Sequence, residues 1–381
     1  HFFIVASREF NAFAAPSGLI FLNSGLIEAT HTEDELASVL AHEIGHVRQR
    51  HIARRIAKNK KVSLGTAALM IIGAAMGGGP LGEALITGSM AAGQSLNLYF
   101  SRKDEEEADR LAYAWMRADH RDPRAMLSMI RTMQRLAKYR SDQPPPYLLT
   151  HPEPQRRAGY IRDLLSALPA DPAPPPRDEF AFQRFRARVL ALTEDLARRR
   201  QRYRRLQDPV WSAYGLALVA MDEARYDEAE RLLAKVRQRY ADQPILDADL
   251  ARIAYARRDL RRARKLLEEA RRRAPADLYI LWLLARIEES TGAQEAAAAL
   301  YEQLVAALPD YPEPYLRLAR LHSAAGRRGK GLYFLAYSFW LSGNEKRAKE
   351  TAEQAVQTAT GATRQKAEEL LAVIERLEKK F

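Results

Sequence analysis

The sequence of 381 residues contains no cysteine. This absence excludes disulfide bonds and every cysteine-ligated metal site, so histidine, aspartate and glutamate remain as the strong metal ligands. It does not distinguish an oxidising compartment from a reducing one. With 47% hydrophobic and 28% charged residues, the chain has the composition of a folded protein of two or three domains rather than a disordered one.

A hydrophobic run long enough to cross a membrane is also lacking. Glu83 is the only charged residue between 62 and 101, and the segment 66–82, TAALMIIGAAMGGGPLG, is apolar and rich in glycine. A membrane-spanning helix needs about 20 predominantly apolar residues, whereas a triple glycine and Pro80 interrupt this segment. We therefore predict a buried helical hairpin at 62–100, with peripheral contact to a membrane surface as the alternative.

Acidic residues are fewer than basic ones, and the formal net charge is +12. The excess is concentrated in 184–207 and 255–275, where arginines share predicted helices with leucine, alanine and glutamate. Aromatic residues are not interleaved with these charges, as a surface for stacking bases requires. We therefore interpret the arginines as solvated helix faces and expect no nucleic-acid partner, with a nucleic-acid-binding solenoid as a third hypothesis.

The chain begins with His1 rather than methionine and at once shows strand-like residues, so we expect an N-terminally truncated or processed piece. No signal-peptide pattern is visible, which leaves the question of a signal peptide open. FFIVAS at 2–7 and GLIFLNSGLI at 18–27 predict short strands, and NAFA at 11–14 precedes a turn. TEDE at 32–35 predicts a capping box and the start of a helix, and an apolar stripe of helical spacing continues from Leu36 to Val47.

Beyond a proline-rich stretch near 168–178, the chain repeats. Alanines 229, 263 and 297 are each 34 residues from the next, as are the pairs Pro275 and Pro309, and Gly292 and Gly326. This is the period of tetratricopeptide repeats, in which pairs of helices stack into a solenoid that binds peptides or partner proteins. We expect the aromatic residues of this region to be inter-helix core, namely Tyr301, Tyr315, Tyr333, Tyr337 and Trp340.

Residues 41–51, AHEIGHVRQRH, place two histidines four residues apart on the helix predicted after residue 32. His42 and His46 therefore share one face and can present imidazole nitrogens to a single ion. Glu43 is the next residue after His42, so it lies beside the ligand face, where its carboxylate could reach a water molecule bound to the metal. The pattern fits metal-assisted peptide hydrolysis with Glu43 as the general base, but it is only moderately specific without a third ligand.

The third ligand is expected in 101–112, SRKDEEEADRLA, which predicts a helix start with acidic residues in its first turn. Glu105, Glu106 and Glu107 compete for the role. Glu105 and Asp109 share a helix face, so Glu105 could bind the metal while Asp109 orients one of the histidines. The alternative is that all these acidic residues only complement the helix dipole.

Three segments, NAFAAPSGLIFLNSGLI, ELASVLAHEIGHVRQRH and SRKDEEEADRLA, in this order, resemble the zinc metalloproteases of the HtpX, Oma and BepA kind. The resemblance covers residues 1 to about 165. It implies that His42, His46 and Glu105 bind one zinc ion per chain, with Glu43 as catalytic base. It also implies a cleft-side edge strand that pairs with the substrate peptide, formed by Asn11, Ala12, Phe13 and Ala14.

The loop THPEPQRR at 150–157 resembles the His-Pro loop of the same family. His151 could be a fourth zinc ligand that closes the resting enzyme, or could stabilise the tetrahedral intermediate, or the loop could be purely structural. Arg157 could bind a substrate carbonyl or carboxylate, or form an ion pair within the fold. Two other histidines are given no site role: His51 is expected to cap the helix end, and His322 to lie at the surface.

The expected fold is mainly α-helical with a small β-sheet: a zincin-type metalloprotease domain followed by a helical tetratricopeptide solenoid. The predicted limits are 1–168 for the protease domain, 169–207 for a proline-rich linker and basic connecting helix, and 208–381 for the repeats.

The leading functional hypothesis is a zinc endopeptidase that cleaves unfolded or misassembled cell-envelope proteins. The resemblance implies a location in the bacterial periplasm and docking of clients, or of the outer-membrane assembly machinery, through the repeats. The alternative is a zinc-stabilised, chaperone-like scaffold with latent proteolytic activity.

Overall fold

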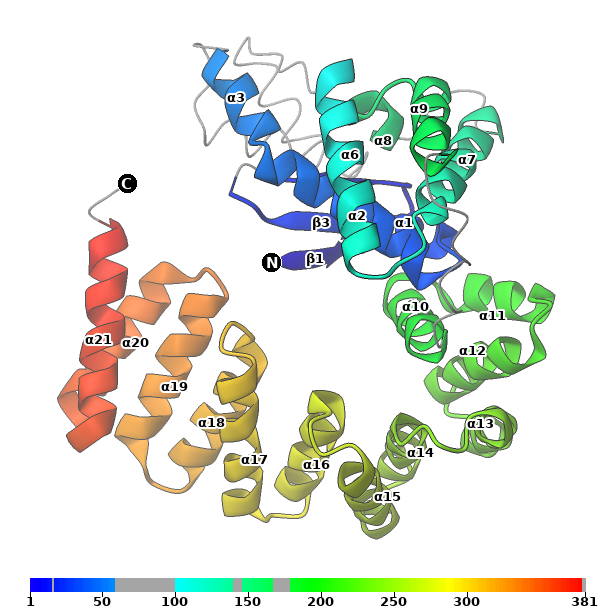
Figure 1. Ribbon diagram of the computed structural model, residues 1–381. Coiled ribbons are helices and arrows are strands. Elements are labelled where there is room, and N and C mark those ends of the chain that lie inside the picture. Colours follow the sequence, from blue (N-terminus) through cyan, green and yellow to red (C-terminus); the bar gives the residue numbers. More distant parts are fainter. Residues whose placement is uncertain (16, 59–99, 140–145, 167–178, 379–381) are drawn as a thin grey trace. The chain divides into compact units, whose positions relative to one another are not determined.

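Figure 1 shows the computed structural model of the chain, which comprises two compact units, His1–Val219 and Ala220–Phe381. The residues that the structure describes are 1–15, 17–58, 100–139, 146–166 and 179–378. The hairpin predicted at 62–100 therefore lies, apart from Phe100, outside the described residues. Among the helices that are described, none has the length and apolar character needed to cross a membrane.

The first unit contains the small sheet that the sequence predicts. Its strands are β1 (Phe2–Val5), β2 (Ala12–Ala14) and β3 (Ile20–Asn23), in the order β1-β3-β2. The pairing of β1 with β3 is parallel and that of β2 with β3 is antiparallel, with Phe13 opposite Phe21. Strand β2 is thus an edge strand, as expected of residues 11–14.

The strand predicted at 18–27 is shorter than expected, because it ends at Asn23 and helix α1 (Ser24–Ala29) follows directly. The Gly25 N–H and the Ser24 hydroxyl both donate to the Ser7 carbonyl, at 2.8 and 2.9 Å, so this backbone bonds to a loop instead of a sheet partner. A Cβ on Gly25 would lie 2.2 Å from the Arg8 carbonyl oxygen, and only glycine permits this approach.

Helix α2 (Glu33–Arg48) begins where the sequence predicts. The Thr32 hydroxyl accepts a hydrogen bond from the Glu35 N–H at 3.2 Å, but the Glu35 carboxylate accepts from the His31 N–H rather than from that of Thr32. Helix α2 packs against β2 and three other helices. The remaining helices of the protease region are α3 (His51–Lys58), α6 (Arg102–Ala118), α7 (Arg124–Tyr139), α8 (Pro146–Thr150) and α9 (Pro154–Ser166).

The predicted basic connecting helix is two helices, α10 (Phe180–Thr193) and α11 (Leu196–Arg205). Both group with the first unit, whose limit lies within α12 (Pro209–Asp222). Helix α10 contacts α1, and Phe182 and Val189 of α10 belong to the core formed with the sheet. The described part of 169–207, residues 179–207, is therefore helical and packs on the first unit, and the domain limits stay a prediction.

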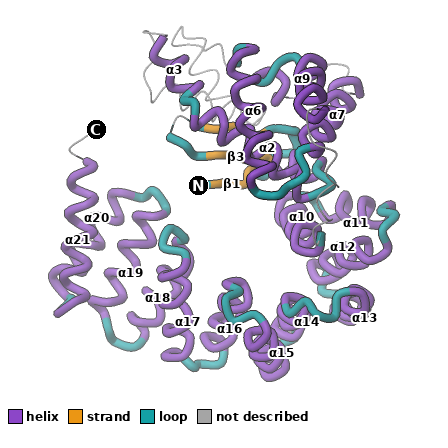
Figure 2. The backbone as a smooth tube through the Cα atoms, in the orientation of Figure 1, coloured by secondary structure: helices purple, strands orange, loops and turns teal. Residues whose placement is uncertain are grey.

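The second unit is a series of helices joined by short turns, and Figure 2 shows its described residues as helix and loop. The repeated alanines 229, 263 and 297 are fully buried, and Gly292 and Gly326 adopt positive φ in equivalent turns. The helices are α13 (Tyr226–Arg239), α14 (Ile245–Ala256), α15 (Leu260–Arg273), α16 (Leu278–Ser290), α17 (Gln294–Ala307), α18 (Pro312–Ala324), α19 (Arg328–Leu341), α20 (Glu345–Thr358) and α21 (Gly361–Glu378).

The aromatic residues of the second unit are largely core, as predicted. Tyr301 and Tyr315 are buried, and the ring of Tyr315 stacks on that of Tyr337 with centroids 4.6 Å apart. His322, expected at the surface, is buried: it stacks on Phe334 and accepts a hydrogen bond from Arg327.

Candidate active site

The candidate site lies in the first unit, where helices α2 and α6 run against each other. Helix α2 carries His42, Glu43 and His46, and α6 carries Glu105. The contact is close because Gly45 of α2 faces the Ala108 backbone of α6; a Cβ on Gly45 would lie 3.0 Å from the Ala108 Cα. The absence of a side chain at Gly45 therefore lets Glu105 approach the two histidines.

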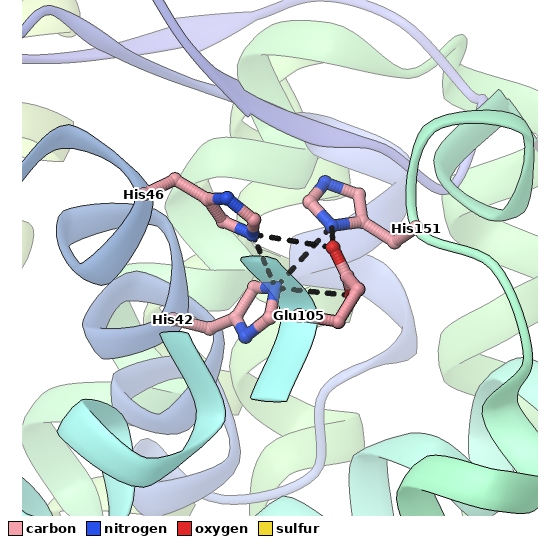
Figure 3. Close-up of side chains that lie close together, drawn as sticks. All are labelled: His42, His46, Glu105 and His151. Carbon is pink, nitrogen blue, oxygen red and sulfur yellow. Dashed lines mark hydrogen bonds and ion pairs between the residues drawn. The ribbon is translucent and has the colours of Figure 1, made fainter. Parts of the chain in front are cut away.

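Four side chains converge at this contact (Figure 3). His42 and His46 point their Nε2 atoms toward each other at 3.0 Å, and His46 Nε2 lies 3.3 Å from Glu105 Oε1. His151, which follows α8, places Nδ1 2.9 Å from Glu105 Oε1 and 3.3 Å from His42 Nε2. One donor atom from each of the four residues lies within 4.8 Å of all the others, and all four side chains are buried.

The chemistry of this cluster fits a metal ion. Imidazole nitrogens and a carboxylate oxygen are the ligands that zinc takes in a cysteine-free site. Glu105 Oε2 is buried and is compensated by the Arg157 guanidinium at 2.9 Å rather than by a hydrogen bond, while Glu105 Oε1 faces the imidazole nitrogens of His46 and His151, where a metal ion would be held. Burial raises the pKa of Glu105, but the charges of His151 and Arg157 outweigh it and hold that pKa well below its ordinary value, so the carboxylate is ionised.

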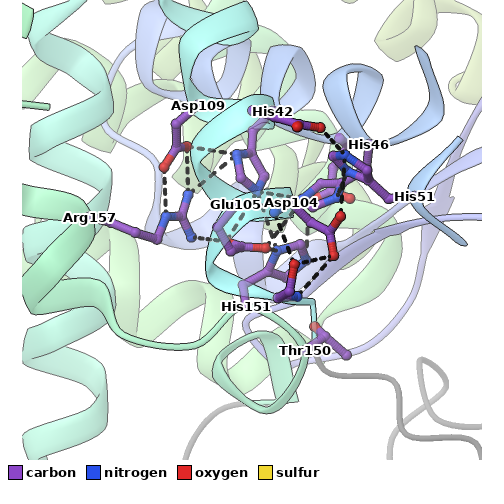
Figure 4. A network of polar contacts seen from close by, with 12 residues as sticks. His42, His46, His51, Asp104, Glu105, Asp109, Thr150, His151 and Arg157 are labelled. Carbon is purple, nitrogen blue, oxygen red and sulfur yellow. Dashed lines mark hydrogen bonds and ion pairs between the residues drawn. The ribbon is translucent and has the colours of Figure 1, made fainter. Parts of the chain in front are cut away.

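Asp109 lies one helical turn beyond Glu105 and faces the outer nitrogen of His42 (Figure 4). Its Oδ1 is 2.7 Å from His42 Nδ1. Asp109 also accepts hydrogen bonds from Arg157, at 2.8 and 2.9 Å, and from the Tyr160 hydroxyl. Burial raises the pKa of Asp109, but the charges of Arg157 and His42 lower it more strongly, so Asp109 stays ionised and fixes the His42 ring.

Of the two alternatives given for Arg157, substrate binding and an ion pair within the fold, its surroundings favour the ion pair. Its side chain is only 5% exposed, and its guanidinium bonds to Asp109 and lies 2.9 Å from Glu105 Oε2. Its guanidinium therefore forms ion pairs with two buried carboxylates of the site and is not directed toward solvent.

Glu43 lies on the opposite side of His151 from Glu105. Its Oε1 is 3.5 Å from His151 Nε2 and accepts a hydrogen bond from the Tyr147 hydroxyl at 3.2 Å. The ring of Tyr147 stacks on His151, with centroids 4.2 Å apart. Burial raises the pKa of Glu43 above its ordinary value, which makes the carboxylate a stronger proton acceptor.

His51 is the site residue that the sequence reasoning missed. It is 2% exposed, and its Nδ1 lies 2.9 Å from His46 Nδ1, while its Nε2 lies 3.1 Å from Glu107 Oε2. Arg50, with φ of 52°, bends the chain between α2 and α3, and His51 follows directly at the start of α3 beside His46. Helical spacing did not find this contact, because the helix ends between the two histidines.

The competing glutamates have separate surroundings. Glu106 is exposed and pairs with Arg110 one turn along α6, whereas Glu107 faces His51. Of the three, only Glu105 enters the cluster of potential ligands.

Residues 11–14 lie beside the same helix, since β2 packs against α2. Asn11 and Ala12 are buried, and Ala14 pairs with Ile20 of β3. The other side of β2 has no strand partner among the described residues.

Comparisons with known proteins agree with these features. Residues 1–165 match the family described as Peptidase family M48, and residues 248–312 match the tetratricopeptide repeat. The beta-barrel assembly-enhancing protease of Escherichia coli K12 is 33% identical over 267 residues, 65% of this chain and 50% of that protein. The chain thus spans about half the length of this relative.

Two further relatives show the extent of the likeness. The beta-barrel assembly-enhancing protease of Yersinia pestis is 30% identical over 362 residues, which cover 90% of this chain and 72% of that protein. Metalloprotease LoiP of Escherichia coli K12 is 32% identical over 171 residues, 43% of this chain and 62% of that protein. The chain belongs to peptidase family M48, with tetratricopeptide repeats following the peptidase domain.

Proposed function

We propose that the chain is a zinc-dependent endopeptidase of the bacterial cell envelope. The observation that carries the proposal is the convergence of His42, His46, Glu105 and His151, from separate segments, with Glu43 beside them. Membership of a peptidase family and relatives named as proteases support it.

In this proposal His42, His46 and Glu105 bind one zinc ion per chain. Zinc held by such ligands supplies Lewis-acid activation of a water molecule and of the scissile carbonyl. Glu43 takes the proton of the attacking water on its carboxylate and later delivers it to the leaving amine. The Tyr147 hydroxyl holds that carboxylate in place, and Asp109 orients His42.

His151 has a separate role in the proposal. Its Nδ1 lies among the ligand atoms and its Nε2 lies 3.5 Å from Glu43 Oε1, so His151 occupies the space between the ligands and the proposed base, where a substrate would enter. We assign His151 to the fourth ligand position of the resting enzyme. It must swing away, with Tyr147 stacked behind it, before a peptide can enter.

Residues Asn11, Ala12, Phe13 and Ala14 are proposed to bind the substrate backbone. Strand β2 is an edge strand packed on the helix that carries Glu43, and its free side can pair with an extended peptide. Main-chain pairing is insensitive to side-chain identity, which suits an enzyme that acts on unfolded clients.

The names of the relatives support the proposed clients and location. Two of them are named for assisting β-barrel assembly, which supports unfolded or misassembled outer-membrane proteins as substrates and the periplasm as location. The tetratricopeptide repeats are proposed to dock clients or the assembly machinery.

The test combines zinc content with cleavage of casein. Wild type is expected to hold one zinc per chain, and Glu105→Gln to lose it. Glu43→Gln is expected to keep zinc and to cleave roughly 10²- to 10⁴-fold more slowly. Glu106→Gln, an exposed neighbour on α6, is the matched control and should match wild type. Absence of zinc under metal-replete conditions would overturn the proposal.

His151→Ala separates two roles of this residue. If His151 closes the resting site, the variant keeps zinc and cleaves faster than wild type. If His151 instead stabilises the tetrahedral intermediate, cleavage falls although zinc is kept.

The burial of every ligand favours a second candidate, a zinc-stabilised scaffold whose repeats bind partners. Stoichiometric zinc without cleavage, in wild type and in His151→Ala, would support the scaffold.

A further inference from the structure

Three arginines of the second unit occupy the same position in successive repeats. Arg252, Arg286 and Arg320 are each 34 residues from the next, and they lie on α14, α16 and α18. Because stacked repeats superpose equivalent positions, the three side chains belong to one face of the unit. This face therefore carries one arginine at the same position of each of three successive repeats.

Two of these arginines line a pocket of about 270 Å³ that lies within the second unit. Apolar residues of three helices, Met221, Leu267, Leu283 and Ile287, form much of its lining. Arg252 and Arg286 supply positive charge, and Asp222 is the acidic residue among the lining residues described. The pocket thus combines an apolar surface with an excess of positive charge, and its volume accommodates one or two side chains rather than a folded partner.

Among the described residues, no acidic side chain neutralises Arg252 or Arg286. Within the described residues, no carboxylate forms an ion pair with either of them, and the buried Nη1 of Arg252 has no hydrogen-bond partner. By contrast, Arg257, Arg262 and Arg264 of the same unit pair with glutamates or aspartate. The Arg286 guanidinium instead lies 5.6 Å from the ring centroid of Tyr255, a contact that holds it in place without neutralising it. Arginines held this way are ready to bind carboxylates.

We propose that this pocket binds an acidic, extended segment of a partner protein. Arg252 and Arg286 each hold one carboxylate of the segment, and the apolar lining takes a side chain between them. Helices α14 and α16 pack directly against each other, and axes of packed helices lie about 8–10 Å apart. Three residues of a polyproline-type peptide span roughly 9 Å and return to the same face, so the preferred sequence has acidic residues three apart.

The aromatic residues of the pocket argue for a peptide over a nucleic acid. The Tyr255 ring is covered by Arg286, and the Tyr226 ring lies 5.9 Å from the Arg257 guanidinium. Each ring therefore has one face occupied by the protein itself, whereas single-stranded nucleic acid needs open aromatic faces for its bases.

The test measures binding of a fluorescent peptide with the pattern Glu-Leu-x-Glu to the full chain carrying Glu43→Gln, so that cleavage does not interfere. The inference does not depend on the proposed peptidase activity, because binding is read directly by anisotropy. The chain with an unaltered pocket should bind this peptide at least tenfold more tightly than the Gln-Leu-x-Gln peptide. Its affinity for the glutamate peptide should fall as the salt concentration rises.

Arg252→Gln/Arg286→Gln should abolish the preference for glutamate. Arg231→Gln/Arg261→Gln, which removes the same charge from helices α13 and α15 outside the pocket lining, is the matched control and should keep it. Equal loss in both double variants would show that only net charge matters and would overturn the proposal. Displacement of the peptide by a single-stranded oligonucleotide of equal charge would overturn it as well.

Discussion

His51 Nδ1 lies 2.9 Å from His46 Nδ1, so a third imidazole stands behind the candidate ligand pair. His46 faces Glu105 through Nε2, which leaves Nδ1–H as the tautomer suited to metal binding. His51 can then accept this proton's hydrogen bond at Nδ1 and donate from Nε2 to Glu107. His46 is thereby held by His51 as His42 is held by Asp109.

Replacing His51 should weaken zinc binding without removing a ligand. His51→Ala leaves His46 free to rotate, and loss of such a partner typically lowers metal affinity about 10- to 100-fold. Competition with a chromophoric chelator measures the affinity, and Glu106→Gln on α6 is the control. An unchanged zinc affinity in His51→Ala would show that His46 needs no partner.

Much of the candidate site follows from local spacing. His42 and His46 share a helix face, and Glu105 and Asp109 share another, because both pairs are four residues apart. The repeats are equally local, since a 34-residue period fixes which alanines are buried. Sequence alone therefore predicts these residues and the order of the two parts.

The remaining contacts depend on how separate segments meet. Arg157 reaches Asp109 across 48 residues, and no local pattern distinguishes this ion pair from substrate binding. His51 meets His46 across the break between α2 and α3, where Arg50 adopts a positive φ. The packing of α10 on α1 could not be predicted from local spacing either. The sequence predicts that the arginines of α10 form a solvated face, whereas Arg186 donates a hydrogen bond to the Glu28 carbonyl of α1.

Gly45 sets the separation of α2 and α6, so enlarging it should disturb the site. In Gly45→Val the added atoms meet the Ala108 backbone, and α6 must shift outward with Glu105. We expect weaker zinc binding and a loss of roughly 1–3 kcal/mol in the free energy of unfolding. Gly159→Val, on α9, is the matched control because a Cβ there meets no atom within 4 Å. The same zinc affinity in both variants would refute this role of Gly45.

Glu28 makes the stability of the first unit depend on pH. Burial raises the pKa of Glu28, but the hydrogen bond and charge of Arg202, with the charge of Arg198, outweigh it and lower that pKa. Because the pKa is lower in the folded state, the stabilisation is present above the unfolded value of about 4.3 and is lost as pH falls through the folded value.

Glu28→Gln should therefore lower the free energy of unfolding by about 1 kcal/mol at pH 7. The difference from wild type should shrink as pH falls below about 4, where Glu28 of the wild type becomes protonated. Urea unfolding at several pH values measures it, with Glu106→Gln as control. A difference that stays constant with pH would mean that packing, not charge, is lost.

Arg157 compensates two buried carboxylates, and its removal should make the fold dependent on metal. In Arg157→Met, Asp109 and Glu105 lose the guanidinium that contacts both, and breaking a buried ion pair typically costs about 3–5 kcal/mol. Zinc restores positive charge beside Glu105, so the rise in Tm on adding zinc should be larger in the variant than in wild type. Arg162→Met, on the same helix, removes an arginine whose Nε bonds only to a backbone carbonyl of its own helix and is the control. A metal-free Arg157→Met chain as stable as Arg162→Met would show that the carboxylates do not need this charge.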